Sequence, residues 1–226
     1  MKKILLFSFL TLFLCSCDRE IEEPVPLGFE YQPLEIGLFW IYEVDQTIYF
    51  GENDSEFSSF FYRDVIRSFF LNEEGESVFV FDRYKAEDQS SWEKESSFTR
   101  HYRGFALLEN QENQISVNLV LPPNEGTFWD SKIYQVEGED EFKYVSSISF
   151  EQGGLVDPAL IRVLQNEEDD EITFRDNRYE IYSQNIGLVE KYFEVVTYCS
   201  RNDCLGDQLI NSGEITLMKL IEHGSE

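Results

Sequence analysis

The sequence predicts an all-β protein of antiparallel strands, arranged as a curved sheet, a half-barrel or a sandwich of two sheets. Three observations support this fold class. Aromatic residues make up 15% of the 226 residues, which favours strands over helices. Apolar and polar residues alternate along several segments, as in strands with one buried face. Turn-forming residues separate these segments, so about a dozen short strands are expected.

The first expected strands lie in the first half of the chain. Residues 40–50 place most of their apolar side chains on one face at a period of two. Residues 77–84 are apolar on both faces, which is typical of a central strand. Residues 115–121 alternate again between apolar and polar side chains. Turn compositions follow at residues 72–75 and 122–126.

The second half repeats this organisation. Strands are expected at residues 172–181, 188–198 and 215–221, and turns at Gly153-Gly154 and residues 211–213. Residues 159–165 are the one short helix candidate, although the matching segment of the first half resembles a strand.

An internal repeat indicates a tandem duplication. The segment from Pro33 to Trp40 is echoed by residues 122–129, and each segment holds a proline, a glycine and a terminal Phe-Trp pair. The strand at 41–45 is echoed by residues 133–137, and later matches keep their order with offsets that grow to 100 residues. The alternative is a resemblance caused by composition alone. The two copies would be residues 31–121 and 122–226, which can form one joint domain.

Composition excludes several function classes. The chain holds 44 Asp and Glu against 18 Lys and Arg, for a formal charge of −26. Such a surface repels phosphate backbones, so no nucleic-acid partner is expected. The chain has only two histidines, so histidine-based catalysis and zinc binding are not expected. No cofactor is expected.

The N-terminus has the layout of a secretory signal. Lys2 and Lys3 precede an apolar run of residues 4–14, which is too short to span a bilayer as a helix. The run ends in Leu14-Cys15-Ser16-Cys17, which resembles the bacterial lipobox, in which a small residue precedes the lipidated cysteine. The resemblance implies that residues 1–16 are a lipoprotein signal peptide and that Cys17 carries the lipid. An ordinary secretory signal, or a buried apolar terminus, is the alternative.

The segment after Cys17 is acidic and contains prolines. Residues 17–30 are expected to form a lipidated tether that holds the body at the membrane. Acidic residues directly after the lipidated cysteine resemble the surface-export signals of Bacteroidota lipoproteins, which implies an outer-membrane protein exposed at the cell surface. In enteric bacteria Asp18 would instead resemble an inner-membrane retention signal.

The remaining cysteines are Cys199 and Cys204, apart from Cys15 in the signal region. The compartment beyond the inner membrane permits disulfides, and the four-residue spacer suits a bridge that closes a turn between strands. A redox site is the alternative, but such sites usually have a two-residue spacer at a helix start.

Two longer segments carry a family resemblance. Residues 31–42, with the later segment 180–189, look like those of uncharacterised Bacteroidota envelope lipoproteins. The resemblance spans most of the chain after the signal peptide. It implies no reaction and no catalytic residue.

No catalytic constellation stands out. The acidic segments 167–171 and 138–141 lack the alternating spacing that wraps a calcium ion, so they are interpreted as solvated charge. His101 is expected on the surface of a strand and His223 in the terminal tail. The sequence therefore favours a non-enzymatic, lipid-anchored envelope protein with a binding or structural role and an unknown ligand or protein partner. The alternative is a lipid-anchored hydrolase with glycosidase-like carboxylate chemistry.

Overall fold

The computed structural model describes residues 26–51, 54–136, 138–145 and 160–226. The signal peptide, Cys17, most of the tether and Gly153-Gly154 lie outside the described residues. Among the described residues, no helix is long and apolar enough to cross a membrane.

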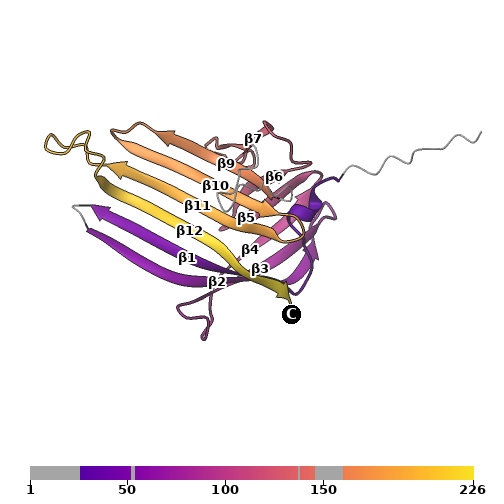
Figure 1. Cartoon of the computed structure of the whole chain (residues 1–226). Coiled ribbons are helices and arrows are strands. Elements are labelled where there is room, and N and C mark those ends of the chain that lie inside the picture. The colour runs from indigo at the N-terminus through magenta and orange to yellow at the C-terminus, as the bar shows by residue number, and fades with distance from the viewer. Residues whose placement is uncertain (1–25, 52–53, 137, 146–159) are drawn as a thin grey trace, which may run out of the picture.

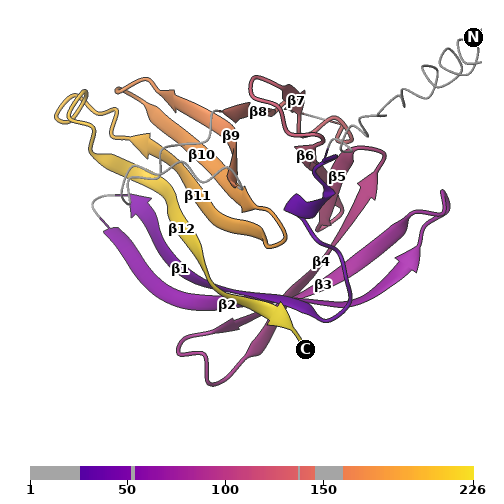
Figure 2. The ribbon, with the colours of Figure 1, turned by 45° about the vertical axis from the view of Figure 1, so that its right-hand side comes forward.

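The described strands form one antiparallel sheet, which confirms the predicted fold class. Its strands are β1 (Leu38–Gly51), β2 (Asp54–Leu71), β3 (Ser77–Ala86), β4 (Glu93–Arg103), β5 (Ala106–Gln111), β6 (Gln114–Val120), β7 (Phe128–Asp130), β8 (Glu141–Val145), β9 (Leu160–Asp169), β10 (Phe174–Ser183), β11 (Gly187–Tyr198) and β12 (Ile210–Ser225). Each strand pairs with its neighbours in sequence, except that β6 and β7 form the two edges of the sheet, and β1 also pairs with β12. The meander therefore curves round into a nearly closed barrel (Figures 1 and 2).

The two edges of the sheet meet along a seam, where β6 lies against β7 and β8. The Val117 amide donates to the Ser131 carbonyl at 2.8 Å, and the Trp129 indole donates to the Val117 carbonyl at 2.8 Å. The Tyr144 hydroxyl donates to the Val120 carbonyl at 2.9 Å and accepts from the Val120 amide at 3.2 Å. These bonds satisfy backbone groups that an open edge would leave unpaired.

One end of the barrel, the η2 end, is covered by the segment before β1. Phe29–Tyr31 form a single 3-10 turn, η2, near the N-terminal end of the described chain (Figure 2). Tyr31 is buried in the core. The Asn185 amide donates to the Glu30 carbonyl at 2.7 Å, which joins η2 to the β10–β11 turn. Gly28 begins this turn at φ 91°, and a Cβ there would lie 2.7 Å from Pro123 Cδ. Only glycine fits both conditions.

The apolar core lies inside the barrel toward the η2 end. Trp40 and Phe81 stack with ring centroids 5.9 Å apart, and Phe81 stacks on Phe98 at 5.0 Å. Tyr42, Leu107, Leu119, Val163, Tyr182 and Leu188 are further buried members of the same cluster. The inner face is thus rich in aromatic residues, as the composition of the chain predicts.

The outer face of β4–β6 is also covered. His101, Leu108 and Val117 are cross-strand neighbours there, and all three are buried. The loop after β7 lies against this face: Gln135 donates to the Ile115 carbonyl at 3.0 Å, and the Arg103 guanidinium lies 5.9 Å from the Tyr134 ring. The prediction that His101 lies on a strand is confirmed, but the prediction that it is at the surface is wrong.

Two other predictions of local structure fail. Residues 160–165 form the start of β9 and not a helix, because Ile161 and Val163 pack into the barrel core while the backbone pairs with β8 and β10. The expected strand at 133–137 is a run of turns over its described residues, because this segment folds over the outer face of β6. Tyr134 therefore does not match Tyr42, which is buried within β1.

Candidate functional site: a polar chamber inside the barrel

The barrel interior changes from apolar to charged beyond the aromatic core. Two adjoining cavities of about 250 and 360 Å³ lie there. They share five lining residues, Glu109, Gln111, Glu180, Lys191 and Phe193, so they form one continuous space, which we call the chamber. Its size falls within the range of small-molecule sites.

Arg100 forms the floor of the chamber against the aromatic core. Its Nε donates to Glu109 at 2.7 Å, and its second nitrogen donates to the side-chain oxygen of Gln32 at 3.0 Å. The guanidinium also lies 5.1 Å from the ring centres of Phe81 and Phe98. Burial lowers the pKa of Arg100, but the charge and hydrogen bond of Glu109, together with Tyr182 and Tyr42, leave this pKa above its usual value. Arg100 is therefore permanently charged, and its partners hold it in place on the chamber wall.

Arg83 is held in a similar way on β3. It forms two hydrogen bonds of 2.7 Å with the buried carboxylate of Asp64 on β2. Its guanidinium lies 4.6 Å from the Tyr62 ring centre, and 5.3 Å from that of Phe98. A planar guanidinium suits both contacts at once, because it binds carboxylates edge-on and aromatic rings face-on.

Glu180 and Lys191 form the centre of the chamber. Lys191 lies 2.8 Å from one carboxylate oxygen of Glu180, and the Tyr182 hydroxyl donates to the other oxygen at 2.6 Å. Burial raises the pKa of Glu180, but the charge and hydrogen bond of Lys191, with the bond from Tyr182, leave it below its usual value. Glu180 is thus an ionised acceptor at neutral pH.

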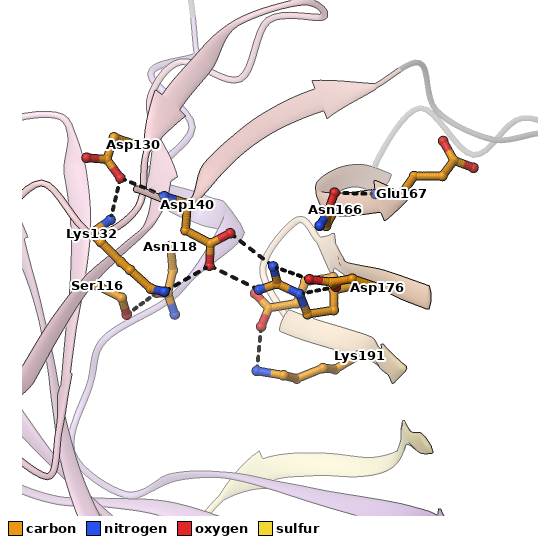
Figure 3. Close-up of polar contacts among 11 residues, drawn as sticks. Ser116, Asn118, Asp130, Lys132, Asp140, Asn166, Glu167, Asp176 and Lys191 are labelled. Atoms are coloured by element: carbon orange, nitrogen blue, oxygen red, sulfur yellow. Dashed lines mark hydrogen bonds and ion pairs between the residues drawn. The ribbon is translucent and has the colours of Figure 1, made fainter. Parts of the chain in front are cut away.

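A fourth charged group, which includes Asp140 and Asp176, lies at the seam side of the chamber (Figure 3). Arg178 binds both oxygens of Asp140 at 3.0 Å and also donates to Asp176 at 2.6 Å. Asp130 accepts from the backbone amides of Lys132 and Asp140, which holds this loop in place. The loop after β7 therefore carries Asp140 back into contact with β10.

Neutral amides complete the chamber wall. The Gln165 side chain is 8% exposed, and it has no hydrogen-bond partner among the described residues. Gln111 and Gln114 also line the space with side-chain amides that are unpaired within the described part of the chain, but both residues are exposed to solvent. Asn118 accepts from Ser116 at 2.8 Å, and its amide nitrogen has no acceptor among the described residues. These groups present both donors and acceptors to the space inside.

The charged lining has an energetic consequence. Transfer of ions from water into a protein interior is costly, and a buried ion pair is often no more stabilising than apolar residues of the same volume. Packing alone therefore gives no reason for so many charges inside the barrel. Their placement makes this part of the barrel interior a polar space.

The disulfide predicted from the sequence is confirmed, and it lies away from the chamber. Cys199 and Cys204 form a disulfide in the β11–β12 connection, with their Cα atoms 5.9 Å apart. This bridge lies at the barrel end opposite η2 (Figure 1). Cys17 lies outside the described residues.

The acidic segment 167–171 is engaged in local contacts, whereas Asp140 of the segment 138–141 binds the distant Arg178. Asp170 accepts from the amides of Ile172 and Thr173 and so shapes the β9–β10 turn. Asp169 pairs with Arg175 at 2.8 Å. In the described part of the chain, no group of three His, Cys, Asp or Glu residues could hold a metal ion.

Sequence reasoning missed the charged residues of the chamber. A signal was present: Arg83 follows Phe81 by two positions, and Arg100 follows Phe98 by two positions. Residues two apart on a strand share a face, so each charge lies on the face of a core aromatic residue.

Comparison with known proteins gives distant similarities. No protein-family model matches the sequence, and no curated protein is significantly similar to it. One similar solved structure is a Bacteroides fragilis protein assigned as exported, with a YmcC-like fold; it has 10% identity and a TM-score of 0.42, over 85% of this chain and 98% of that one. Another is a Parabacteroides distasonis protein assigned as a lipoprotein, with 10% identity and a TM-score of 0.40, over 86% of this chain and 98% of that one. Both are too distant to transfer a function.

Proposed function

We propose that this chain is a non-enzymatic, lipid-anchored protein of the bacterial outer membrane, exposed at the cell surface, that holds a small polar molecule inside its barrel. The chamber carries the binding part of this proposal. Inside a nearly closed sheet, it combines cations that are each paired with a carboxylate and side-chain amides that have no partner among the described residues. The anchoring part is supported by the residues around Cys17 that resemble a lipobox.

Hydrolysis is the less favoured alternative. A glycosidase needs one carboxylic acid whose pKa is raised, so that it can protonate the leaving oxygen. Glu109 and Glu180 line the chamber together, but Glu109 is paired with Arg100 and the pKa of Glu180 is lowered by Lys191. Both carboxylates therefore suit hydrogen-bond acceptance better than proton donation.

Anchoring is tested by Cys17→Ser in the full chain. Only a thiol accepts the diacylglycerol, so this variant should lose labelling by a palmitate analogue and leave the membrane fraction. Cys15→Ser is the matched control and should remain labelled. If Cys17→Ser is still labelled, the anchoring proposal is wrong.

Binding in the chamber is tested by native mass spectrometry of the full-length protein, extracted from cell envelopes in mild detergent. We expect one small molecule per chain. Gln111→Trp fills the space that both cavities share and should abolish the adduct, whereas Phe57→Trp, at an exposed outer position, should keep it. An adduct that survives Gln111→Trp in a folded protein would contradict the proposal.

A further inference from the structure

The fixed charges of the chamber neutralise one another. Arg83, Arg100, Arg178 and Lys191 each have a carboxylate partner within 3.0 Å. Lys132, the remaining cation of the lining, lies 3.8 Å from Asp140, which also binds Arg178. An anionic ligand would have to displace a carboxylate to reach any of these cations. A buried pair is strongly disfavoured when one member loses its partner, so such displacement costs several kcal/mol.

The groups that remain available are neutral amides. Gln165 is the clearest, because it is nine-tenths buried, lines the chamber and has no hydrogen-bond partner among the described residues. The polar atoms of this side chain still reach solvent in the chamber, so a ligand hydroxyl would replace water as their partner. A ligand hydroxyl can both donate and accept, so it matches an amide better than a group with only one of these properties.

One aromatic ring is also available on the chamber wall. Phe193 lines both cavities, and neither a ring nor a cation contacts it among the described residues. The aromatic rings of Phe81 and Phe98, in contrast, are already covered by Arg100. Phe193 thus offers an apolar face beside the polar amides, which suits a molecule with hydroxyl edges and a C–H face.

From these three features we propose that the ligand of the chamber is an uncharged polyhydroxylated molecule of the size of a mono- or disaccharide. This inference rests on the proposed binding function and specifies its ligand class. Glu214 would serve as a further acceptor for hydroxyl groups: one of its oxygens accepts from Gln46 at 2.9 Å and from Thr216 at 2.5 Å, and the other has no hydrogen-bond partner among the described residues. A cationic ligand at Glu214 is the competing possibility that the experiment separates.

The experiment is calorimetric titration of the full-length protein in detergent with two sets of probes at low and high salt. The first set holds neutral mono- and disaccharides, and the second holds amino acids, dicarboxylates and small amines. We expect binding of at least one neutral sugar with little dependence on salt. Gln165→Leu should weaken it at least about fivefold, and Asn202→Ala, in the disulfide-bearing loop, should leave it unchanged. Gln111→Leu, at an exposed strand end, replaces Gln165→Leu if that variant does not fold.

The outcomes separate the ligand class from the function. Salt-sensitive binding of a charged probe, lost in Gln111→Trp, would overturn the ligand class and keep the binding function. Sugar binding that both Gln165→Leu and Gln111→Leu leave intact would overturn the site. Absence of binding by every probe, together with no adduct in native mass spectrometry, would overturn both proposals.

Discussion

His101 shows how the environment of one residue sets its chemistry. Its imidazole lies on the outer face of β4, where the loop after β7 covers it, and it is 8% exposed. Burial lowers the pKa of His101. Glu76, 3.5 Å away, raises this pKa and Arg103 lowers it, so burial decides the net direction. The ring is therefore neutral in the folded protein at neutral pH.

The protein should consequently lose stability between pH 7 and pH 5. When the pH drops below about 6.5, the usual pKa of histidine, His101 takes up a proton more readily in the unfolded chain than in the folded chain. The free energy of unfolding therefore decreases as the pH is lowered. In urea titrations at pH 7 and pH 5, the free energy of unfolding of His101→Gln should decrease less than that of the wild type. His223 is the only other histidine and is exposed, so His223→Gln should behave like the wild type. Equal pH dependence in wild type and His101→Gln would contradict the argument.

At the scale of strands, alternation predicted the elements well but not the lining of the interior. The strands at 40–50, 77–84 and 188–198 correspond to β1, β3 and β11. On β10, alternation would bury Ile181 and expose Glu180, but both are buried, at 4% and 3% exposure. Glu180 faces the chamber and Ile181 lies on the opposite face, so a period of two cannot show which face is inside.

The tandem duplication remains a prediction, and its two tryptophans have different environments. Each lies early in its strand, after a glycine with positive φ, and each indole donates to a distant backbone carbonyl. Trp40 is 3% exposed in the core, whereas Trp129 is half-buried at the seam. The positions are similar, but the burial is not.

Truncation of the two rings should therefore have unequal effects. Trp40→Ala should lower the free energy of unfolding by about 3–5 kcal/mol, because it leaves a cavity against Phe81. Trp129→Ala should lower the free energy of unfolding by a smaller amount, because part of the Trp129 ring is already exposed to water. Chemical denaturation of both variants measures the difference. Equal losses would indicate that the half-buried ring supports the barrel as strongly as the core ring does.

At the scale of the whole molecule, the weakest part of the barrel is the seam. β1 and β12 share a long ladder of paired residues, whereas β7 has three residues and β6 meets it through few backbone bonds. Side chains add contacts across the seam: the Trp129 indole and the Tyr144 hydroxyl both bind backbone groups of β6. The chamber lies beside this seam, because Ser116, Asn118 and Ser131 line it. A change in how the seam closes would therefore also change the shape of the chamber.

Tyr144→Phe tests this link, because it removes one hydroxyl and keeps the ring. The Val120 amide and carbonyl would lose this partner in a partly buried place, so the free energy of unfolding should fall by about 1 kcal/mol. Hydrogen exchange should become faster at the Val120 amide and its neighbours on β6, and remain unchanged across the β1–β12 ladder. Tyr49→Phe is the control, since its hydroxyl has no hydrogen bond among the described residues. If exchange on β6 stays as slow as in the wild type, the backbone contact between Val117 and Ser131 is enough to hold the seam, and the hydroxyl does not close the barrel.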